Sequence, residues 1–411
     1  MKILLTVLLA LLCGTSVALG QAKPPADDFA KWPVQVKLPP EVLKIWTPND
    51  GKPPKDSGPG PEVVAWVPDN VKKIRGAILI ANNTDLVRIG EHTTIRQVAT
   101  KHELAIVYFA KIDGKLIEWA DPPAAAKDGF AAIFDQLSQK TGIAEFKHAP
   151  WITLGKSSRG RFAFRPAWAF PDRVIASVAY HGEAPTWPMP EWSKVKDAGS
   201  VLHVNVQGLA EWDGTWYRHV RPMLLNYHRH TDWLAHQMVI YGVDHGYYTD
   251  YYLYGNHGKP MDKNHKMIRC TDVWDYLALF IDKAVTLRVP KDTYPTDAPT
   301  KLLNLKRDDG YLIHPRAPEE LLGSKWMALR RADNGDYKAI PWPDETTPVF
   351  DTVQGKIDLD KLVVPAANVP ADERSNYMWV PDRDIARAWL KLHNLHSLAD
   401  RVLPPANNEK K

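Results

Sequence analysis

The chain has 411 residues, of which 45% are hydrophobic and 24% charged, so it is long enough to bury a large core. This composition excludes a disordered, collagenous or coiled-coil protein. The 52 Lys and Arg residues against 48 Asp and Glu residues leave a formal net charge of +4, which is too small to favour nucleic acid as a partner.

The first 20 residues have the pattern of a secretory signal peptide. One charged side chain, Lys2, precedes an apolar run over 3–12, and a segment rich in small residues ends at Gly20. The run is too short to span a bilayer. Cys13 follows Leu12, whereas a lipoprotein signal would place a small residue there. We therefore expect export to the periplasm or the medium, cleavage near Gly20 and no lipid anchor.

Removal of this segment leaves a single cysteine, Cys270, so we expect no disulfide bond within the mature chain. No other stretch reaches the roughly 18 apolar residues that a membrane-spanning helix needs. We therefore expect no membrane association after cleavage.

Residues 21–61 form a proline-rich arm. They contain ten prolines in 41 residues, which favour extended backbone and disfavour helix interiors and sheet ladders. We expect this arm to lie on the surface and regular structure to begin near Glu62.

Short apolar runs rich in β-branched residues then follow in chain order and predict strands. Two of them, 76–81 and 104–109, are too continuous for half-exposed strands, which predicts a parallel sheet covered by helices. The other predicted strands are 63–67, 151–154, 174–179, 201–206 and 238–241.

Helical spacing separates several of these strands. Phe130, Ile133, Phe134 and Leu137 share one helical face, and Gly142 is placed to end that helix. Further helices are predicted over 216–235, from a cap at Thr271 to about Ala284, and over 383–398.

Alternating strands and helices predict an α/β domain with a mostly parallel sheet over residues 62–290. After Pro290 prolines recur and apolar runs shorten. We interpret 291–411 as a partly β C-terminal extension, packed on the sheet or over its active-site edge.

A candidate nucleophile lies where the strand 151–154 meets the next helix. The turn reads Gly155-Lys156-Ser157-Ser158-Arg159-Gly160. A serine at such a sharp turn needs small neighbours, because its backbone is strained and the helix passes close to the strand. Gly155 lies two residues before Ser157, but Arg159 occupies the usual place of a second glycine. With Ser158 as nucleophile, Lys156 would occupy a position that needs a small residue, so we favour Ser157.

Strand, turn and helix in this order resemble the α/β-hydrolase family, and residues 155–160 look like a variant of its Gly-His-Ser-Ala-Gly-Gly turn. The resemblance spans about residues 62–288. It implies the α/β-hydrolase fold, with a serine nucleophile after the fifth strand, an acid after the seventh and a histidine after the eighth.

The resemblance also implies candidates for the other two residues of a catalytic triad. Glu211, three residues after Gly208, is the candidate acid, with Asp213 as the alternative, and His245 is the candidate base. In such a triad His245 accepts the proton of Ser157, and the acid orients and stabilises the imidazolium.

Further residues are expected to bind the reacting group. The family's oxyanion hole implies the backbone N–H of Ser158 and that of Asn82 or Asn83. Arg161 matches a basic residue of the family's sugar-acid esterases and could pair with an acidic group, although a solvent-facing role is the alternative. Trp212 could stack on a sugar or aromatic ring, or could simply pack in a loop.

The 15 histidines raise the question of a metal site. His228 and His230 are two residues apart, so on a helix they point to different faces, and no His-Glu-x-x-His pattern or cysteine cluster occurs. We expect no metal and no cofactor.

Together these features predict an exported serine hydrolase. We expect a carboxylesterase that forms an acyl-enzyme on Ser157 and acts on a small-molecule or carbohydrate ester, or on an aromatic one. The alternative hypothesis is a binding protein that kept the fold and lost turnover, which Arg159 in the turn would favour. The sequence leaves the ester and the oligomeric state undetermined.

Overall fold

The computed structural model describes residues 29–39, 61–81, 84–110, 124–182, 200–208, 223, 230–240, 268–314, 327–331, 337–341, 361–393 and 395–403. The predicted signal peptide, residues 1–20, lies outside these ranges. Among the described residues, no helix is both long and apolar enough to cross a membrane.

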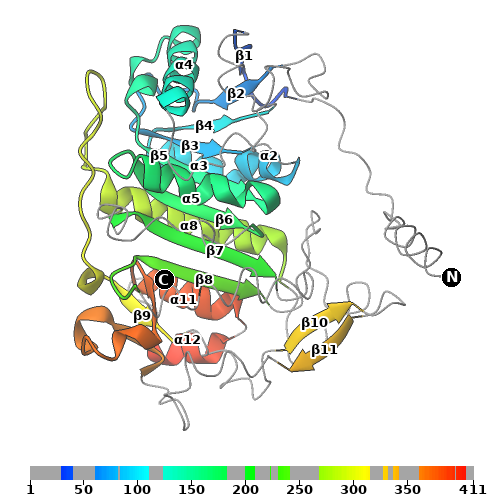
Figure 1. The fold of residues 1–411 in the computed structure, drawn as a ribbon, viewed down its shortest axis with the longest axis vertical. Coiled ribbons are helices and arrows are strands. Elements are labelled where there is room, and N and C mark those ends of the chain that lie inside the picture. Colours follow the sequence, from blue (N-terminus) through cyan, green and yellow to red (C-terminus); the bar gives the residue numbers. More distant parts are fainter. Residues whose placement is uncertain are drawn as a thin grey trace, which may run out of the picture.

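An eight-stranded sheet forms the centre of the fold, in the order β1-β2-β4-β3-β5-β6-β7-β8 (Figure 1). From β3 to β8 the strands pair in parallel, and every residue in them is buried. This confirms the predicted parallel sheet. The strands are β1 (Val34–Val36), β2 (Val63–Trp66), β3 (Gly76–Ile80), β4 (Leu104–Tyr108), β5 (Trp151–Lys156), β6 (Val174–Tyr180), β7 (Leu202–Gly208) and β8 (Ala235–Ile240).

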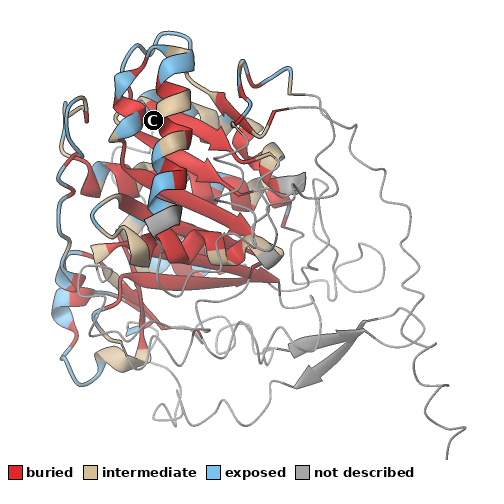
Figure 2. Ribbon diagram, turned by 45° about the horizontal axis from the view of Figure 1, so that its top comes forward, coloured by how far each residue is buried: buried red, intermediate tan, exposed pale blue. Residues whose placement is uncertain are grey.

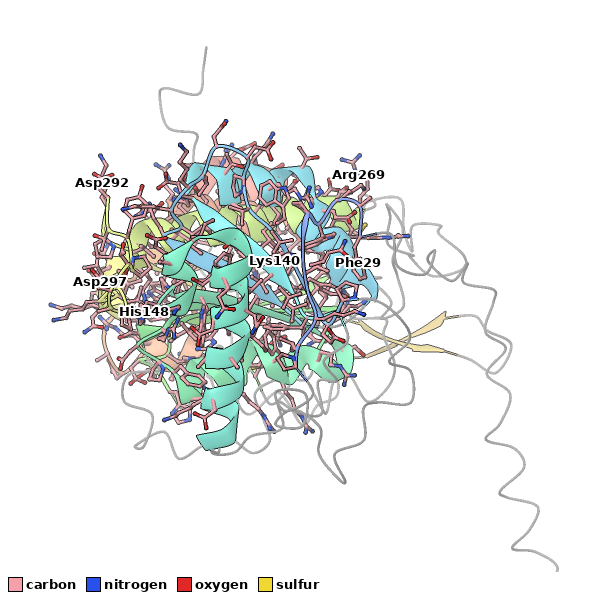
Figure 3. The ribbon with its side chains drawn as sticks, turned by 90° about the horizontal axis from the view of Figure 1, so that it is seen from above. Phe29, Lys140, His148, Arg269, Asp292 and Asp297 are labelled. Carbon is pink, nitrogen blue, oxygen red and sulfur yellow. The ribbon has the colours of Figure 1, made fainter. Side chains whose placement is uncertain are left out.

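The expectation that regular structure begins near Glu62 was wrong. Strand β1 lies within the proline-rich segment and pairs antiparallel with β2, which itself pairs antiparallel with β4. The three residues Val34–Val36 lie between Pro33 and Pro39, and an edge strand tolerates prolines at its ends. Phe29, labelled in Figure 3, precedes this strand, and the centre of its ring lies 6.3 Å from that of Tyr108.

Helices cover both faces of the sheet. On one face, Thr153 Oγ1 donates a hydrogen bond to the carbonyl of Ala163 in α5 at 2.6 Å. On the other, the His236 ring lies 2.6 Å from the Tyr276 hydroxyl of α8. Figure 2 shows the central strands buried, with exposed residues on the outer helices and turns. The helices of this domain are α2 (Thr84–Glu91), α3 (Thr93–Lys101), α4 (Ala124–Thr141), α5 (Gly160–Ala169) and α8 (Cys270–Arg288).

Two of the predicted helices occur, the first with the expected end and the second with a shifted start. Helix α4 buries the four predicted apolar residues and ends before Gly142, whose φ of +74° suits a residue without a side chain. The N-cap of helix α8 lies two residues earlier than expected. Arg269, not Thr271, is its N-cap, because the Asp272 carboxylate accepts the backbone N–H of Arg269 at 2.8 Å.

The predicted helix over 216–235 is wrong at its end, because residues 230–234 are not helical and Ala235 is the first residue of β8. Pairing of Ala235 with His203 of β7 overrides the local pattern there.

The C-terminal extension contributes a second sheet, β12-β9-β13, and two helices. The predicted helix over 383–398 is divided, because Leu395 N donates to Leu390 O at 2.9 Å and closes the first helix. The elements are β9 (Tyr311–Ile313), β12 (Val363–Pro365), β13 (Met378–Val380), α11 (Arg383–Leu392) and α12 (His396–Val402). A separate antiparallel pair consists of β10 (Met327–Arg331) and β11 (Tyr337–Pro341).

Strand β8 is the last strand of the main sheet, and the extension covers its free edge. The backbone N–H of Gln237 donates to Met378 Sδ at 3.3 Å, and its carbonyl accepts the indole N–H of Trp389 at 2.8 Å. Trp379 and Trp389 are almost fully buried in this contact region. Side chains of the extension therefore take the hydrogen bonds that another strand would otherwise take.

Two histidines are buried where the extension meets the sheet. Burial lowers the pKa of His236 to about 3, and the nearby His393 adds to this effect. Burial also lowers the pKa of His393 to about 4. Both rings are therefore neutral at pH 7, and Tyr276 beside His236 has its pKa raised by burial.

The segment between α8 and β9 runs back across the domain. Thr296 Oγ1 donates to Glu145 Oε1 at 3.0 Å, and Figure 3 labels Asp297, the residue after Thr296. This contact ties the start of the extension to the short 3₁₀ helix η2 (Ala144–Lys147) that precedes β5.

Candidate functional site

The sharp turn after β5 holds Ser157 in an unusual backbone conformation. Strand β5 passes through the single 3₁₀ turn η3 (Ser157–Arg159) directly into α5. Ser157 has a φ of +54°, in the left-handed region that costs a residue with a side chain on the order of 1 kcal/mol or more. Its N–H donates to the carbonyl of His181 at 3.0 Å. Surrounding contacts therefore have to maintain this conformation.

Close backbone contacts at Gly155 and Gly182 make the turn possible. A Cβ added to Gly155 would overlap the backbone carbonyl of Arg159, and a Cβ added to Gly182 would lie 2.7 Å from the Cα of Gly160. That Cβ on Gly182 would also lie 3.4 Å from the nitrogen of Ser157. Each of these approaches is between backbones, which cannot move aside cheaply.

Arg159 occupies the place where the sequence pattern usually has a glycine, and the structure shows why it is accommodated. The close approach to Gly155 involves the Arg159 carbonyl, not its side chain, which is half-buried. The residue after Arg159, Gly160, makes the close contact with Gly182, which follows β6. The turn keeps its tight packing with glycine shifted by one position.

A second strained residue lies beside the first. His181, directly after β6, has a φ of +46° and is 2% exposed. Its N–H donates to Val206 O of β7 at 2.7 Å, while its carbonyl accepts the N–H of Ser157. Two left-handed, non-glycine residues at the ends of neighbouring strands are thus joined by one hydrogen bond.

Polar side chains of β7 continue this contact. Gln207 Nε2 donates to the carbonyl of Gly182 at 2.5 Å and lies 3.1 Å from Asn205 Oδ1. Gln207 and Asn205 are both fully buried. The sequence interpretation missed Gly182 and Gln207. One signal was available, because polar and apolar residues alternate along β7 although the whole strand is buried.

A second Ser–His pair lies within strands β6 and β7 and is not part of the candidate site. Ser177 Oγ and His203 Nδ1 lie 2.5 Å apart, and the His203 ring stacks on Phe164. Both residues are fully buried in the face that α5 covers. The pair can stabilise the core, but no substrate can reach it.

Lys156, the last residue of β5, is also fully buried. Its ammonium nitrogen lies 5.9 Å from the centre of the Tyr180 ring, within the range of a cation–π contact. The side chain therefore belongs to the packing beneath the turn.

The remaining candidate residues fall partly outside the described part of the chain. Arg161 is half-buried in the first turn of α5, and the backbone of Ser158 belongs to η3. The other candidates all lie outside the described residues. They are Asn82, Asn83, Glu211, Trp212, Asp213 and His245.

The strands that lead to these residues end at one edge of the sheet. Gly208, three residues before Glu211, pairs with Ile240, five residues before His245. Strand β6 alone separates β7 from β5, so the chain leaves β7 roughly 10 Å from Ser157 and leaves β8 roughly 15 Å from it. Loops of a few residues can span such distances.

Ala81, the residue before Asn82, donates its N–H to Leu154 O of β5 at 3.0 Å, so the loop after β3 begins beside the turn. Within the described ranges, no three His, Cys, Asp or Glu side chains gather as a metal site would require.

No protein-family model matches the chain, and no curated protein matches its sequence. Similar solved structures include poly(aspartic acid) hydrolase-1 from Sphingomonas sp. KT-1, with 14% identity over 45% of this chain and 88% of that one and a TM-score of 0.33. S-formylglutathione hydrolases from Staphylococcus aureus and Agrobacterium tumefaciens share 12% identity each. They cover 44% and 55% of this chain and 85% and 87% of their own, with TM-scores of 0.32 and 0.33. The strand order and the turn after β5 are those of an α/β-hydrolase fold.

Proposed function

We propose that the protein is an exported serine hydrolase that cleaves a carboxylic ester through an acyl-enzyme on Ser157. The observation that carries this proposal is the backbone of Ser157. It is held at a φ of +54° between β5 and α5 by close backbone contacts at Gly155, Gly160 and Gly182. A strained serine at a strand-to-helix turn is what presents a nucleophile in this fold. A turn that served only to start a helix would not need such strain.

In the proposed reaction His245 accepts the proton of Ser157 as its oxygen attacks the ester carbonyl. Glu211 holds the imidazole in the required tautomer and stabilises the cation that forms. His245 then donates its proton to the leaving alcohol, and water releases the acyl group by the same two steps.

The tetrahedral oxyanion would form at the N-terminal end of α5. The N–H of Ser158 in η3 is one proposed donor, and the helix dipole favours negative charge there. Asn82 or Asn83 would supply the second donor, because their loop begins at Ala81 beside β5.

The substrate is proposed to be a small-molecule or carbohydrate ester. Arg161 follows the nucleophile by four residues and could pair with a carboxylate on the substrate. Trp212 could stack on a sugar or aromatic ring. A location in the periplasm or outside the cell agrees with the signal-peptide pattern of residues 1–20.

A fluorophosphonate probe tests the nucleophile directly, because it reacts only with an activated serine. The wild-type protein should be labelled and Ser157→Ala should not, whereas Ser158→Ala, the matched control, should keep its labelling. Labelling lost only in Ser158→Ala would move the nucleophile by one residue. An unlabelled wild type would contradict the proposal and favour a binding protein that retains the fold.

The choice between the two acids is a separate measurement. Glu211→Gln should lower ester turnover by roughly a thousandfold or more, and Asp213→Asn far less. The reverse ranking would make Asp213 the acid.

A further inference from the structure

We propose that Gln207 is a positioning residue for the nucleophile, a role that rests on the proposed function of Ser157. The inference begins with the strain in the site. The left-handed conformations of Ser157 and His181 are both unfavourable for residues with side chains. They persist only if neighbouring groups fix the backbone at both ends of their shared hydrogen bond.

After β6, the side chain of Gln207 bonds to the backbone of the segment that contacts Ser157. The turn His181–Gly182 supplies the carbonyl that accepts the Ser157 N–H, and Gly182 packs on Gly160 and on the nitrogen of Ser157. The Gly182 carbonyl in turn accepts Gln207 Nε2 at 2.5 Å. Gln207 is therefore hydrogen-bonded to the same segment, His181–Gly182, that accepts the N–H of Ser157.

The orientation of the Gln207 amide follows from its partners. A backbone carbonyl can only accept, so the amide must present its nitrogen to Gly182. The same nitrogen lies 3.1 Å from Asn205 Oδ1, which fixes the Asn205 amide as well. Gln207 Oε1 and Asn205 Nδ2 then have no hydrogen-bond partner among the described residues.

Such an arrangement carries a stability cost, as does the buried amide of Gln237 on the adjacent strand. A buried amide that leaves a polar atom unsatisfied costs about 1–3 kcal/mol, whereas an apolar side chain of the same shape would avoid that cost. What distinguishes Gln207 from Gln237 is its hydrogen bond to Gly182, which fixes the geometry of the turn. Displacement of a catalytic group by about 1 Å can lower a rate by two orders of magnitude.

Gln237 on the adjacent strand provides a matched control. It pairs with Asn205 across β7 and β8, is 2% exposed, and neither Nε2 nor Oε1 has a hydrogen-bond partner in the described part of the chain. Replacing Gln237 with Met also removes a buried amide, but it breaks no hydrogen bond toward the turn.

The test compares Gln207→Met with Gln237→Met in the full-length protein. We expect Gln207→Met to lower kcat and the maximal rate of fluorophosphonate labelling by about 10-fold to 100-fold, with KM and probe affinity little changed. Gln237→Met should keep the wild-type rates. A residue with only a structural role would lower the melting temperature without lowering the rate per folded molecule.

A labelling rate of Gln207→Met equal to that of the labelled wild type would overturn the positioning role alone. An unlabelled wild type would overturn the proposed function and this inference together. If Gln207→Met does not fold, Asn205→Leu carries the test, because it removes the oxygen that accepts the second hydrogen bond of Gln207 Nε2. That variant should slow labelling in the same direction by a smaller factor, and an unchanged rate would overturn the inference.

Discussion

The carboxyl edge of β5 and β6 and the free edge of β8 both bury polar groups, but in opposite ways. At the first, Ser157 and His181 are strained, and Gln207 leaves one of its polar atoms without a partner among the described residues. At the second, side chains of the extension bond to both backbone groups of Gln237. Strained backbone is a feature of functional sites, whereas a sheet edge whose backbone groups are satisfied stabilises a fold.

This difference shows how the two kinds of region can be separated in one sheet. Substitutions at the β8 edge should lower the free energy of unfolding and leave the chemistry of folded molecules intact. Substitutions at the turn after β5 should lower the labelling rate of folded molecules and change the free energy of unfolding less. The predictions below measure stability, fluorophosphonate labelling or both.

The largest loss of stability is expected at Trp389. Trp389→Ala removes a fully buried ring and leaves the Gln237 carbonyl without its donor, which together should cost about 5 kcal/mol of unfolding free energy. Trp389→Phe keeps most of the ring and loses the donor, so it should cost roughly 1–3 kcal/mol. Urea unfolding measures both. A wild-type stability in Trp389→Ala would contradict the edge-covering role.

The largest loss of labelling is expected at Gly155. In Gly155→Ala the new Cβ would collide with the Arg159 carbonyl, so the turn must shift, and labelling should fall by about 100-fold or more. Gly142→Ala is the control, because Gly142 has a φ of +74° and no atom within 4 Å of an added Cβ. It should cost roughly 1 kcal/mol and leave labelling unchanged. Equal labelling of the two variants would show that the tight turn does not matter.

Acid should destabilise the region around the extension. His236 and His393 have pKa values lowered to about 3 and about 4, below the 6.5 of an unfolded chain. The unfolded state therefore binds protons more readily, so stability is complete above pH 6.5 and falls as the pH drops toward 4. The loss at pH 4.5 should be roughly 3–5 kcal/mol. His393→Gln should flatten this dependence between pH 6.5 and 4.5, and an unchanged slope would exclude that ring as a source.

The smallest effect is expected at an exposed ion pair of α11. Asp384, which is 61% exposed, lies 2.6 Å from Lys283 Nζ, so Asp384→Ala should cost less than about 0.5 kcal/mol. Asp382→Ala is the contrasting variant, because its carboxylate caps the helix by accepting Ile385 N–H at 2.9 Å. It should cost about 1 kcal/mol. Thermal unfolding distinguishes the two, and labelling should be normal in both. A larger loss in Asp384→Ala than in Asp382→Ala would contradict the assignment.

The sequence predicted the parts of the fold that depend on local pattern. Continuous apolar runs are typical of strands buried on both faces, so β3 and β4 could be recognised, and Gly142 showed where α4 ends. The three-residue β1 could not be recognised, because it forms only when β2 pairs with it. The residues around Ala235 likewise gave no local sign that β8 would begin there by pairing with β7.

For the candidate site, too, only the features that depend on local pattern could be predicted. The turn at Gly155 and Ser157 is a local motif, so its position between strand and helix followed from the sequence. The support given by Gly182 and Gln207 depends on which strands lie side by side. Those two residues are 25 positions apart, and only the order β5-β6-β7 brings both to Ser157.

The cover over β8 also has a consequence for biosynthesis. Met378 and Trp389 lie 141 and 152 residues beyond Gln237 in the chain. At translation rates of 5–20 residues per second, β8 emerges roughly 8–30 s before the side chains that shield it. During that interval the nascent sheet has an open margin that another chain could join.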